Sequence, residues 1–103
     1  MKEVAKHVSF MREALLEAAR AEEKDEVPVG ALVISESHIL SRAHNRTISV
    51  NDPTAHAEIL AIREACRIKK NYRLPGCDLY VTLEPCPMCL GAILQARIRR
   101  LIF

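Results

Sequence analysis

Two cysteines stand three residues apart in the segment Pro85-Cys86-Pro87-Met88-Cys89. Positions i and i+3 of a helix share one face, so Cys86 and Cys89 can bind one metal ion together. We expect the segment at the start of a helix, where the positive end of the helix dipole stabilises the thiolate form that binds zinc. Pro87 is tolerated there because the first N–H groups of a helix lack intrahelical partners. The pair therefore predicts a metal site.

A second short segment, His56-Ala57-Glu58, supplies further side chains for this site. His56 can provide a third ligand from a neighbouring helix. Positions i and i+2 point to different sides of a helix, so Glu58 is poorly placed to bind the same ion. A carboxylate that lies beside a metal without binding it can carry protons for a metal-bound water. Three protein ligands leave one tetrahedral position open, which is typical of a catalytic zinc.

Other interpretations of the cysteines remain open at this level. A Cys-x-x-Cys pair can be a redox centre, although a redox pair has no use for a His-x-Glu segment. The zinc site would be closed and structural if Cys77 supplied a fourth ligand, but Glu58 would then have no role. Cys66 falls on the apolar face of its helix and is expected in the core. Residues 1–10 carry no secretion signal, so the cysteines are expected as thiols or metal ligands in a cytoplasmic protein.

The two segments match the zinc deaminase signature H-x-E…P-C-x-x-C. The sequence around them resembles the bacterial tRNA-specific adenosine deaminases, and the resemblance covers nearly the whole chain. The matching stretches are residues 26–30, 45–46, 52–58, 71–74, 79–86, 91–93 and 96–98.

This resemblance implies a function and several site residues. The three zinc ligands would be His56, Cys86 and Cys89, and Glu58 would move protons. Asn45 would hydrogen-bond the target base, with Val27 and Leu83 near the pocket wall. The family works as a homodimer and converts the wobble adenosine of the tRNA anticodon loop to inosine. In that reaction, zinc-bound hydroxide attacks C6 of a flipped adenine and ammonia leaves.

Two alternative functions remain beside this one. Guanine deaminases share the zinc signature, so the substrate could be free guanine, cytosine or a nucleoside. The Val-Thr-Leu before Glu84 and the Asp-Pro-Thr-Ala before His56 favour the tRNA enzyme. The chain also stops in mid-strand at residues 99–103, where the family continues with another strand and helices. An inactive zinc-binding fragment is therefore the second alternative.

The elements that position these residues follow from local patterns. Residues 3–22 predict an amphipathic helix, and residues 29–34 and 38–46 predict an antiparallel pair of strands. Asp52 suits the N-cap and Pro53 the first position of a helix that runs to about Lys69. A strand at 78–84, a helix at 85–96 and a strand at 98–103 favour a parallel strand pair. The apolar positions of the first helix are Val4, Val8, Met11, Leu15, Ala18 and Ala19.

Together these elements predict a three-layer α/β/α fold of the cytidine-deaminase type with a mixed sheet. The 103 residues would form one zinc-dependent deaminase domain, incomplete at its C-terminus, with the final strand and helices missing. No apolar run approaches the roughly 18 residues that a membrane helix needs. Residues 63–103 hold eight basic and three acidic side chains. This basic half either binds an anion such as RNA or is a solvated helix face.

Overall fold

The computed structural model describes all of residues 1–103 as three helices packed on a four-stranded sheet. The elements in chain order are α1 (Lys2–Glu23), β1 (Gly30–Ser35), β2 (His38–His44), α2 (Ala57–Lys69), β3 (Asp78–Val81), α3 (Pro87–Gln95) and β4 (Arg100–Ile102). None of the three helices combines the length and the apolar character that crossing a membrane requires.

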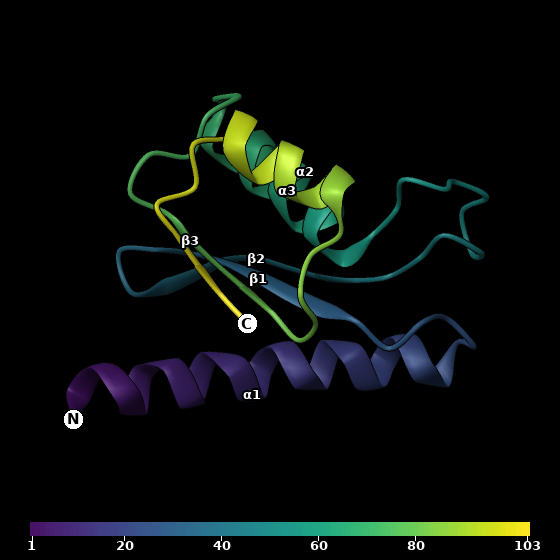
Figure 1. Ribbon diagram of the computed structural model, residues 1–103, viewed down its shortest axis with the longest axis horizontal. Helices are drawn as coiled ribbons and strands as arrows, with labels where there is room; N and C mark the ends of the chain where they lie inside the picture. The colour runs from purple at the N-terminus through teal and green to yellow at the C-terminus, as the bar shows by residue number, and fades with distance from the viewer.

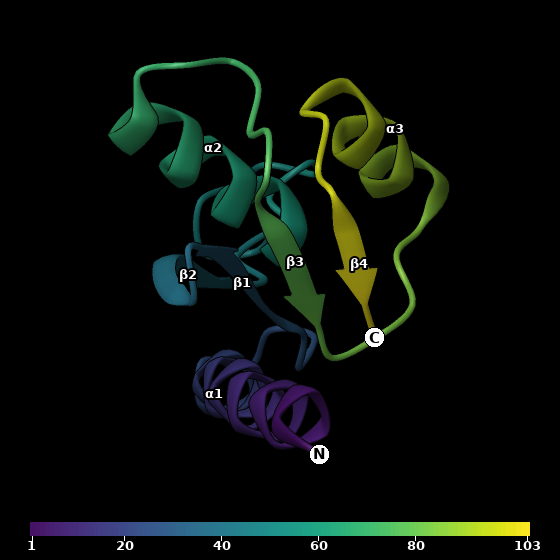
Figure 2. The ribbon, with the colours of Figure 1, turned by 90° about the vertical axis from the view of Figure 1, so that its left-hand side faces the viewer.

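The sheet is mixed and has the strand order β2-β1-β3-β4. β1 pairs antiparallel with both β2 and β3, whereas β3 and β4 are parallel. α1 covers one face of the sheet, and α2 and α3 cover the other (Figure 1). Figure 2 shows β3 and β4 side by side and running in the same direction. The predicted three-layer α/β/α arrangement with a mixed sheet is confirmed.

The central strand β1 contributes to two cores because successive side chains of a strand point to opposite faces. Leu32 and Ile34 pack toward α1 with Tyr80. Ala31 and Val33 pack on the other face, in the larger core beneath α2 and α3. Because both faces are covered, β1 reads in the sequence as a continuous apolar run and not as an alternating one.

Gly30, at the start of β1, lies directly against the backbone of α1. A Cβ atom placed on Gly30 would lie 2.0 Å from the carbonyl oxygen of Ala14 and 2.7 Å from the nitrogen of Ala18. The helix can approach this closely only with small side chains between the two backbones. Ala14, Ala18 and Ala21 therefore form the buried face of α1, together with Glu17.

The predicted apolar face of α1 is therefore wrong in part. Met11 is half-buried and Ala18 is buried, but Val4, Val8, Leu15 and Ala19 are exposed. The close contact at Gly30 selects the alanine side of the helix, and the larger apolar residues consequently point outward.

Substituting Gly30→Ala is expected to destabilise the fold by about 1–3 kcal/mol, because overpacking forces α1 away from β1. Urea denaturation of both forms measures this difference. Gly91→Ala is the matched control, since a Cβ at Gly91 meets nothing within 4 Å. That substitution is expected to be neutral or to stabilise α3 by up to about 1 kcal/mol. Equal unfolding midpoints for Gly30→Ala and the wild type would contradict the close packing.

The starts of α2 and α3 differ from the predictions. α2 begins at Ala57, with His56 as its N-cap, and not at Asp52-Pro53. Asp52 instead closes a turn, where its Oδ1 accepts hydrogen bonds from the Thr54 N–H at 2.8 Å and hydroxyl at 2.7 Å. The strand predicted at 78–84 ends at Val81, and the helix predicted from Pro85 begins at Pro87. The segments before both helices are therefore loops.

Candidate active site

Three potential metal ligands converge where the N-terminal ends of α2 and α3 meet. Nδ1 of His56 lies 3.6 Å from Sγ of Cys86 and 3.5 Å from Sγ of Cys89. The three ligand atoms all lie within 4.8 Å of one another. Bonds of about 2.3 Å to sulfur and about 2.0 Å to nitrogen at tetrahedral angles place these atoms about 3.6 Å apart. The donor set therefore fits one tetrahedral zinc ion.

The local backbone explains how two helices present these side chains. His56 and Cys86 are the N-caps of α2 and α3, and both have an extended backbone with φ of −74°. Pro87 occupies the first position of α3, which places Cys89 in the first turn. His56 was predicted inside the first turn of its helix, but it lies one residue before that turn. The N-terminal N–H groups of both helices thus surround the same point.

The thiol of Cys89 is fully buried, and this has an electrostatic consequence. Burial raises the pKa of Cys89 far above its usual range, and the charge of neighbouring Glu58 raises it further. These effects oppose the helix dipole, which was expected to favour the thiolate. A nearby cation would offset both, because opposite charge favours the ionised form. The donor chemistry therefore suits a bound metal better than a free thiolate.

The remaining cysteines lie elsewhere. Cys77 is buried in the core beneath α2 and α3 and is absent from the group of potential ligands. Its sulfur contacts the carbonyl oxygen of Pro75 at 3.9 Å. Cys66 is half-buried and packs against the same core, as expected. The structure consequently does not form a closed site with a fourth cysteine.

A pocket of about 260 Å³ lies beside the ligand group. Pockets for small molecules typically begin at about 300 Å³, so this one suits a small ligand. Glu58 lines the pocket and is only 4% exposed. The lining residues are Val27, Val29, Asn45, Thr47, His56, Glu58, Leu83, Glu84 and Cys86. The structure thus brings together every site residue predicted from the sequence, with the fully buried Cys89 next to the pocket.

Asn45 is held in place by the start of α2. Its Oδ1 accepts a hydrogen bond of 2.8 Å from the backbone N–H of Ala57. His56, the N-cap residue, makes no side-chain cap bond of its own, so Asn45 performs this role from outside the helix. The side-chain amide keeps its two N–H donors for other partners. Asn45 therefore connects the pocket wall to the helix that carries His56 and Glu58.

Sequence reasoning missed the residue that holds the loop after Asn45. Glu26 is buried and accepts hydrogen bonds from the N–H groups of Ile48 at 3.1 Å and Ser49 at 2.6 Å. The hydrogen bond from the Ser49 hydroxyl lowers the pKa of Glu26, against the effect of burial. A single glutamate before Val-Pro-Val has no spaced partner, so no pattern identified its role. The pocket residues Val29, Thr47 and Glu84 were also missed, although Val29 and Glu84 lie within matching stretches of the resemblance and Thr47 follows one.

Comparison with known proteins gives consistent results. Residues 4–103 match the family described as the cytidine and deoxycytidylate deaminase zinc-binding region. The tRNA-specific adenosine deaminase of Aquifex aeolicus is 56% identical over 94 residues, covering 91% of this chain and 62% of that protein. The chain spans about three fifths of the length of the curated relatives it matches.

Two solved structures have the same fold. One, from a study of A-to-I editing by tRNA:A34 deaminases at the wobble position of transfer RNA, has a TM-score of 0.90 and 56% identity. The aligned region covers 91% of this chain and 68% of the chain in that structure. The other is guanine deaminase from Bacillus subtilis, with a TM-score of 0.90 and 40% identity. The aligned region covers 93% of this chain and 62% of the guanine deaminase chain. The fold is thus shared by relatives that act on different substrates.

Proposed function

The chain belongs to the cytidine and deoxycytidylate deaminase zinc-binding family, and we propose that it converts adenosine to inosine at the wobble position of tRNA. One observation carries the proposal: the ligand group, a buried carboxylate and an anchored amide meet at one small pocket. The higher identity to tRNA-specific adenosine deaminase than to guanine deaminase favours the RNA substrate.

In this proposal His56, Cys86 and Cys89 hold one zinc ion. When bound, zinc would act as a Lewis acid and make hydroxide available near neutral pH. The buried Cys89 and the half-buried Cys86 provide thiolates, and His56 provides the imidazole nitrogen that lies about equally far from both sulfurs. The chain contributes three protein ligands, which leaves one side of the site free for water and substrate.

Glu58 carries the protons of the reaction. Its carboxylate takes a proton from the attacking water and then delivers it to the adenine ring. A C–O bond forms at C6 of the base, Glu58 passes the second proton of the water from the new hydroxyl to the amino group, the C–N bond breaks, and ammonia leaves. The burial of Glu58 beside the ligand group keeps the proton near the reacting carbon and away from bulk water.

Asn45 and the pocket wall orient the base. The Oδ1 atom of Asn45 accepts the Ala57 N–H, and the two N–H groups of its amide remain as donors to the base. Val27 and Leu83, which both line the pocket, provide apolar walls against the flat faces of a ring. This combination suits a planar heterocycle with ring nitrogen acceptors.

The choice of substrate is tested by ammonia release from the zinc-loaded protein. The substrates are an anticodon stem-loop with adenosine at the wobble position, free adenosine and free guanine. We expect the stem-loop to react fastest, because binding energy from the remote parts of a substrate contributes to catalysis. Equal or faster turnover of free guanine would favour a small-molecule deaminase instead.

We also infer that the protein acts as a homodimer. Leu90 and Leu94 stand four residues apart on α3 and are both exposed. Apolar side chains that share one side of a helix favour burial against a partner. Sedimentation equilibrium measures the state directly, and a monomer at micromolar concentration would contradict the inference.

A further inference from the structure

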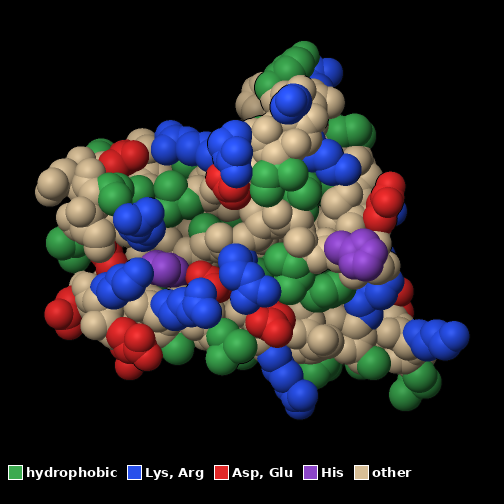
Figure 3. Space-filling model, turned by 180° about the vertical axis from the view of Figure 1, so that it is seen from behind, with side chains coloured by type: hydrophobic (Ala, Val, Ile, Leu, Met, Phe, Trp, Pro, Cys, Tyr) green, Lys and Arg blue, Asp and Glu red, His purple; other side chains and the backbone are tan.

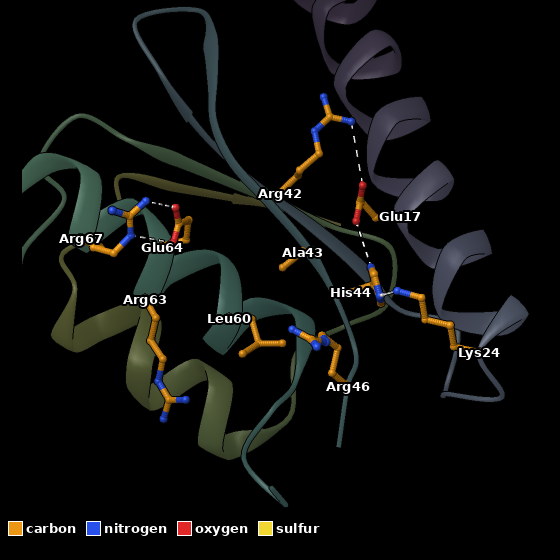
Figure 4. Close-up of a pocket in the computed structure, with 10 residues that line it drawn as sticks. All are labelled: Glu17, Lys24, Arg42, Ala43, His44, Arg46, Leu60, Arg63, Glu64 and Arg67. Carbon is orange, nitrogen blue, oxygen red and sulfur yellow. Dashed lines mark hydrogen bonds and ion pairs between the residues drawn. The ribbon is translucent and has the colours of Figure 1, made fainter. Parts of the chain in front are cut away.

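A second, larger pocket of about 640 Å³ lies along β2, an edge strand of the sheet. Its side chains come from α1 and the residue after it, from β2 and the residues that follow, and from α2 (Figure 4). Five of the ten lining residues are basic: Lys24, Arg42, Arg46, Arg63 and Arg67. Figure 3, which views the β2 side of the molecule, shows Lys and Arg side chains gathered on this surface.

The two carboxylates of this basic pocket are engaged by other groups. Glu17 is buried and accepts hydrogen bonds of 3.0 Å from both Arg20 and His44. Glu64 forms an ion pair with Arg67, the neighbour three residues along α2. Both carboxylates of the pocket are thus already bound to neighbouring side chains. Glu17 also forms an ion pair of 3.9 Å with Arg42, so the two carboxylates offset Arg42 and Arg67 but not Lys24, Arg46 or Arg63.

Three of the cations keep their charge available. Arg46 lines the pocket together with Leu60 and makes no side-chain hydrogen bond or ion pair with the other residues drawn (Figure 4). Arg63 forms one long ion pair, with Nη1 lying 3.8 Å from Oδ2 of Asp52, and its side chain is more than half exposed. Lys24 Nζ lies 3.5 Å from Nε2 of His44, a contact that brings no negative charge to the lysine. The pocket consequently presents a surplus of positive charge.

The basic pocket shares a loop with the candidate active site. Arg46 lies between Asn45 and Thr47, which both line the smaller pocket. The backbone N–H of Arg46 donates a 3.0 Å hydrogen bond to the carbonyl oxygen of Ala55, which ties the two ends of the loop together. Arg63 contacts Asp52 of the same loop. The two pockets are therefore held in a fixed relation to one another.

We propose that the basic pocket binds a backbone phosphate of an RNA substrate whose flipped base occupies the smaller pocket. This inference rests on the proposed function. Guanidinium groups bind phosphate through paired hydrogen bonds, and four of the five cations are arginines. A free base carries no phosphate, so the basic pocket favours a polymeric substrate. Contacts to phosphate hold the RNA in place without reading its sequence.

The test uses Arg46→Gln and Arg63→Gln in the zinc-loaded protein, with Arg12→Gln as the matched control. Arg12 is an exposed arginine of α1 outside the pocket, and its substitution removes the same charge. The dissociation constant for a fluorescent anticodon stem-loop is measured over a range of salt concentrations. We expect each pocket variant to weaken binding roughly tenfold and to lower the slope of log Kd against log salt by about one. A stem-loop of different sequence should show the same loss.

The outcomes separate this inference from the proposed reaction. If the wild type binds RNA through Arg46 and Arg63 but releases no ammonia, the reaction is wrong and the phosphate site stands. If the wild type deaminates RNA and both pocket variants bind like Arg12→Gln, the phosphate site is wrong and the reaction stands. Inorganic phosphate provides the last comparison. Stabilisation of the wild type by phosphate, lost in Arg63→Gln while RNA affinity stays unchanged, would mean a free-anion pocket and would overturn the inference.

Discussion

Replacing Glu58 with glutamine is expected to slow deamination by about 10²–10⁴-fold, because proton transfer by a positioned side chain typically contributes this much. Glutamine has nearly the same shape, but it cannot accept a proton from water and return it to the ring. The metal should remain, since the three potential ligand atoms belong to other residues. Single-turnover ammonia release gives the rate, and elemental analysis of the same sample gives the zinc content.

The control for this result is Glu22→Gln, which changes an exposed carboxylate on α1 that does not line the pocket. It should retain both zinc and turnover. If Glu58→Gln lost zinc as well as activity, Glu58 would be a ligand and the proton-transfer role would be wrong. If it kept full activity, another group would have to carry the protons.

Substituting Cys86→Ser is expected to abolish stoichiometric zinc binding. A serine hydroxyl stays protonated near neutral pH and is a poor replacement for a thiolate, which is the form of cysteine that binds the metal. Only one thiolate and one imidazole would then remain of the three-residue group. Removal of the metal should also lower stability, since a ligand at about 100 times its Kd stabilises a folded protein by about 2.7 kcal/mol. A chelator should therefore lower the melting temperature of the wild type but not that of Cys86→Ser.

Cys77→Ser provides the comparison for this prediction. Cys77 is 1% exposed and packs in the core, so its serine variant is expected to be less stable. It should nevertheless bind one zinc ion while it remains folded. Full zinc content in Cys86→Ser, or loss of zinc from folded Cys77→Ser, would show that the ligands have been assigned to the wrong residues.

The layers of the fold could be predicted because they depend on local patterns. The apolar run that became β1 and the polar turn after it are short-range signals, and they correctly predicted a hairpin. The start of α2 could not be predicted in the same way. Asp52-Pro53 suits either a turn or a helix start, and the hydrogen bond from Ala57 to Asn45 accompanies the later start. The buried face of α1 likewise depended on Gly30, which follows the end of the helix.

The residues of the candidate site likewise differ in whether a local sequence signal identifies them. The spacing within His56-Ala57-Glu58 and between Cys86 and Cys89 is a local signal, and the structure places these residues together. The support of Glu26 for the loop after Asn45 has no such signal. The basic pocket draws on Lys24, Arg42 and Arg46 as well as on residues of α2. The count of charges pointed only to residues 63–103, so it missed three of the five cations of this pocket.

The hydrogen bond between Asn45 and Ala57 restricts how the specificity of this pocket can evolve. A replacement at position 45 must keep an acceptor at the Oδ1 position, or the N-terminal end of α2 loses its cap together with the alignment of Glu58. Aspartate meets that requirement but removes both donors, so folding and base recognition cannot be varied independently here. Val27 and Leu83 do not support the fold in this way, because both side chains are more than half exposed. Lineages that adapt this scaffold to a different ring should therefore accumulate their changes at the pocket walls, while position 45 stays nearly invariant.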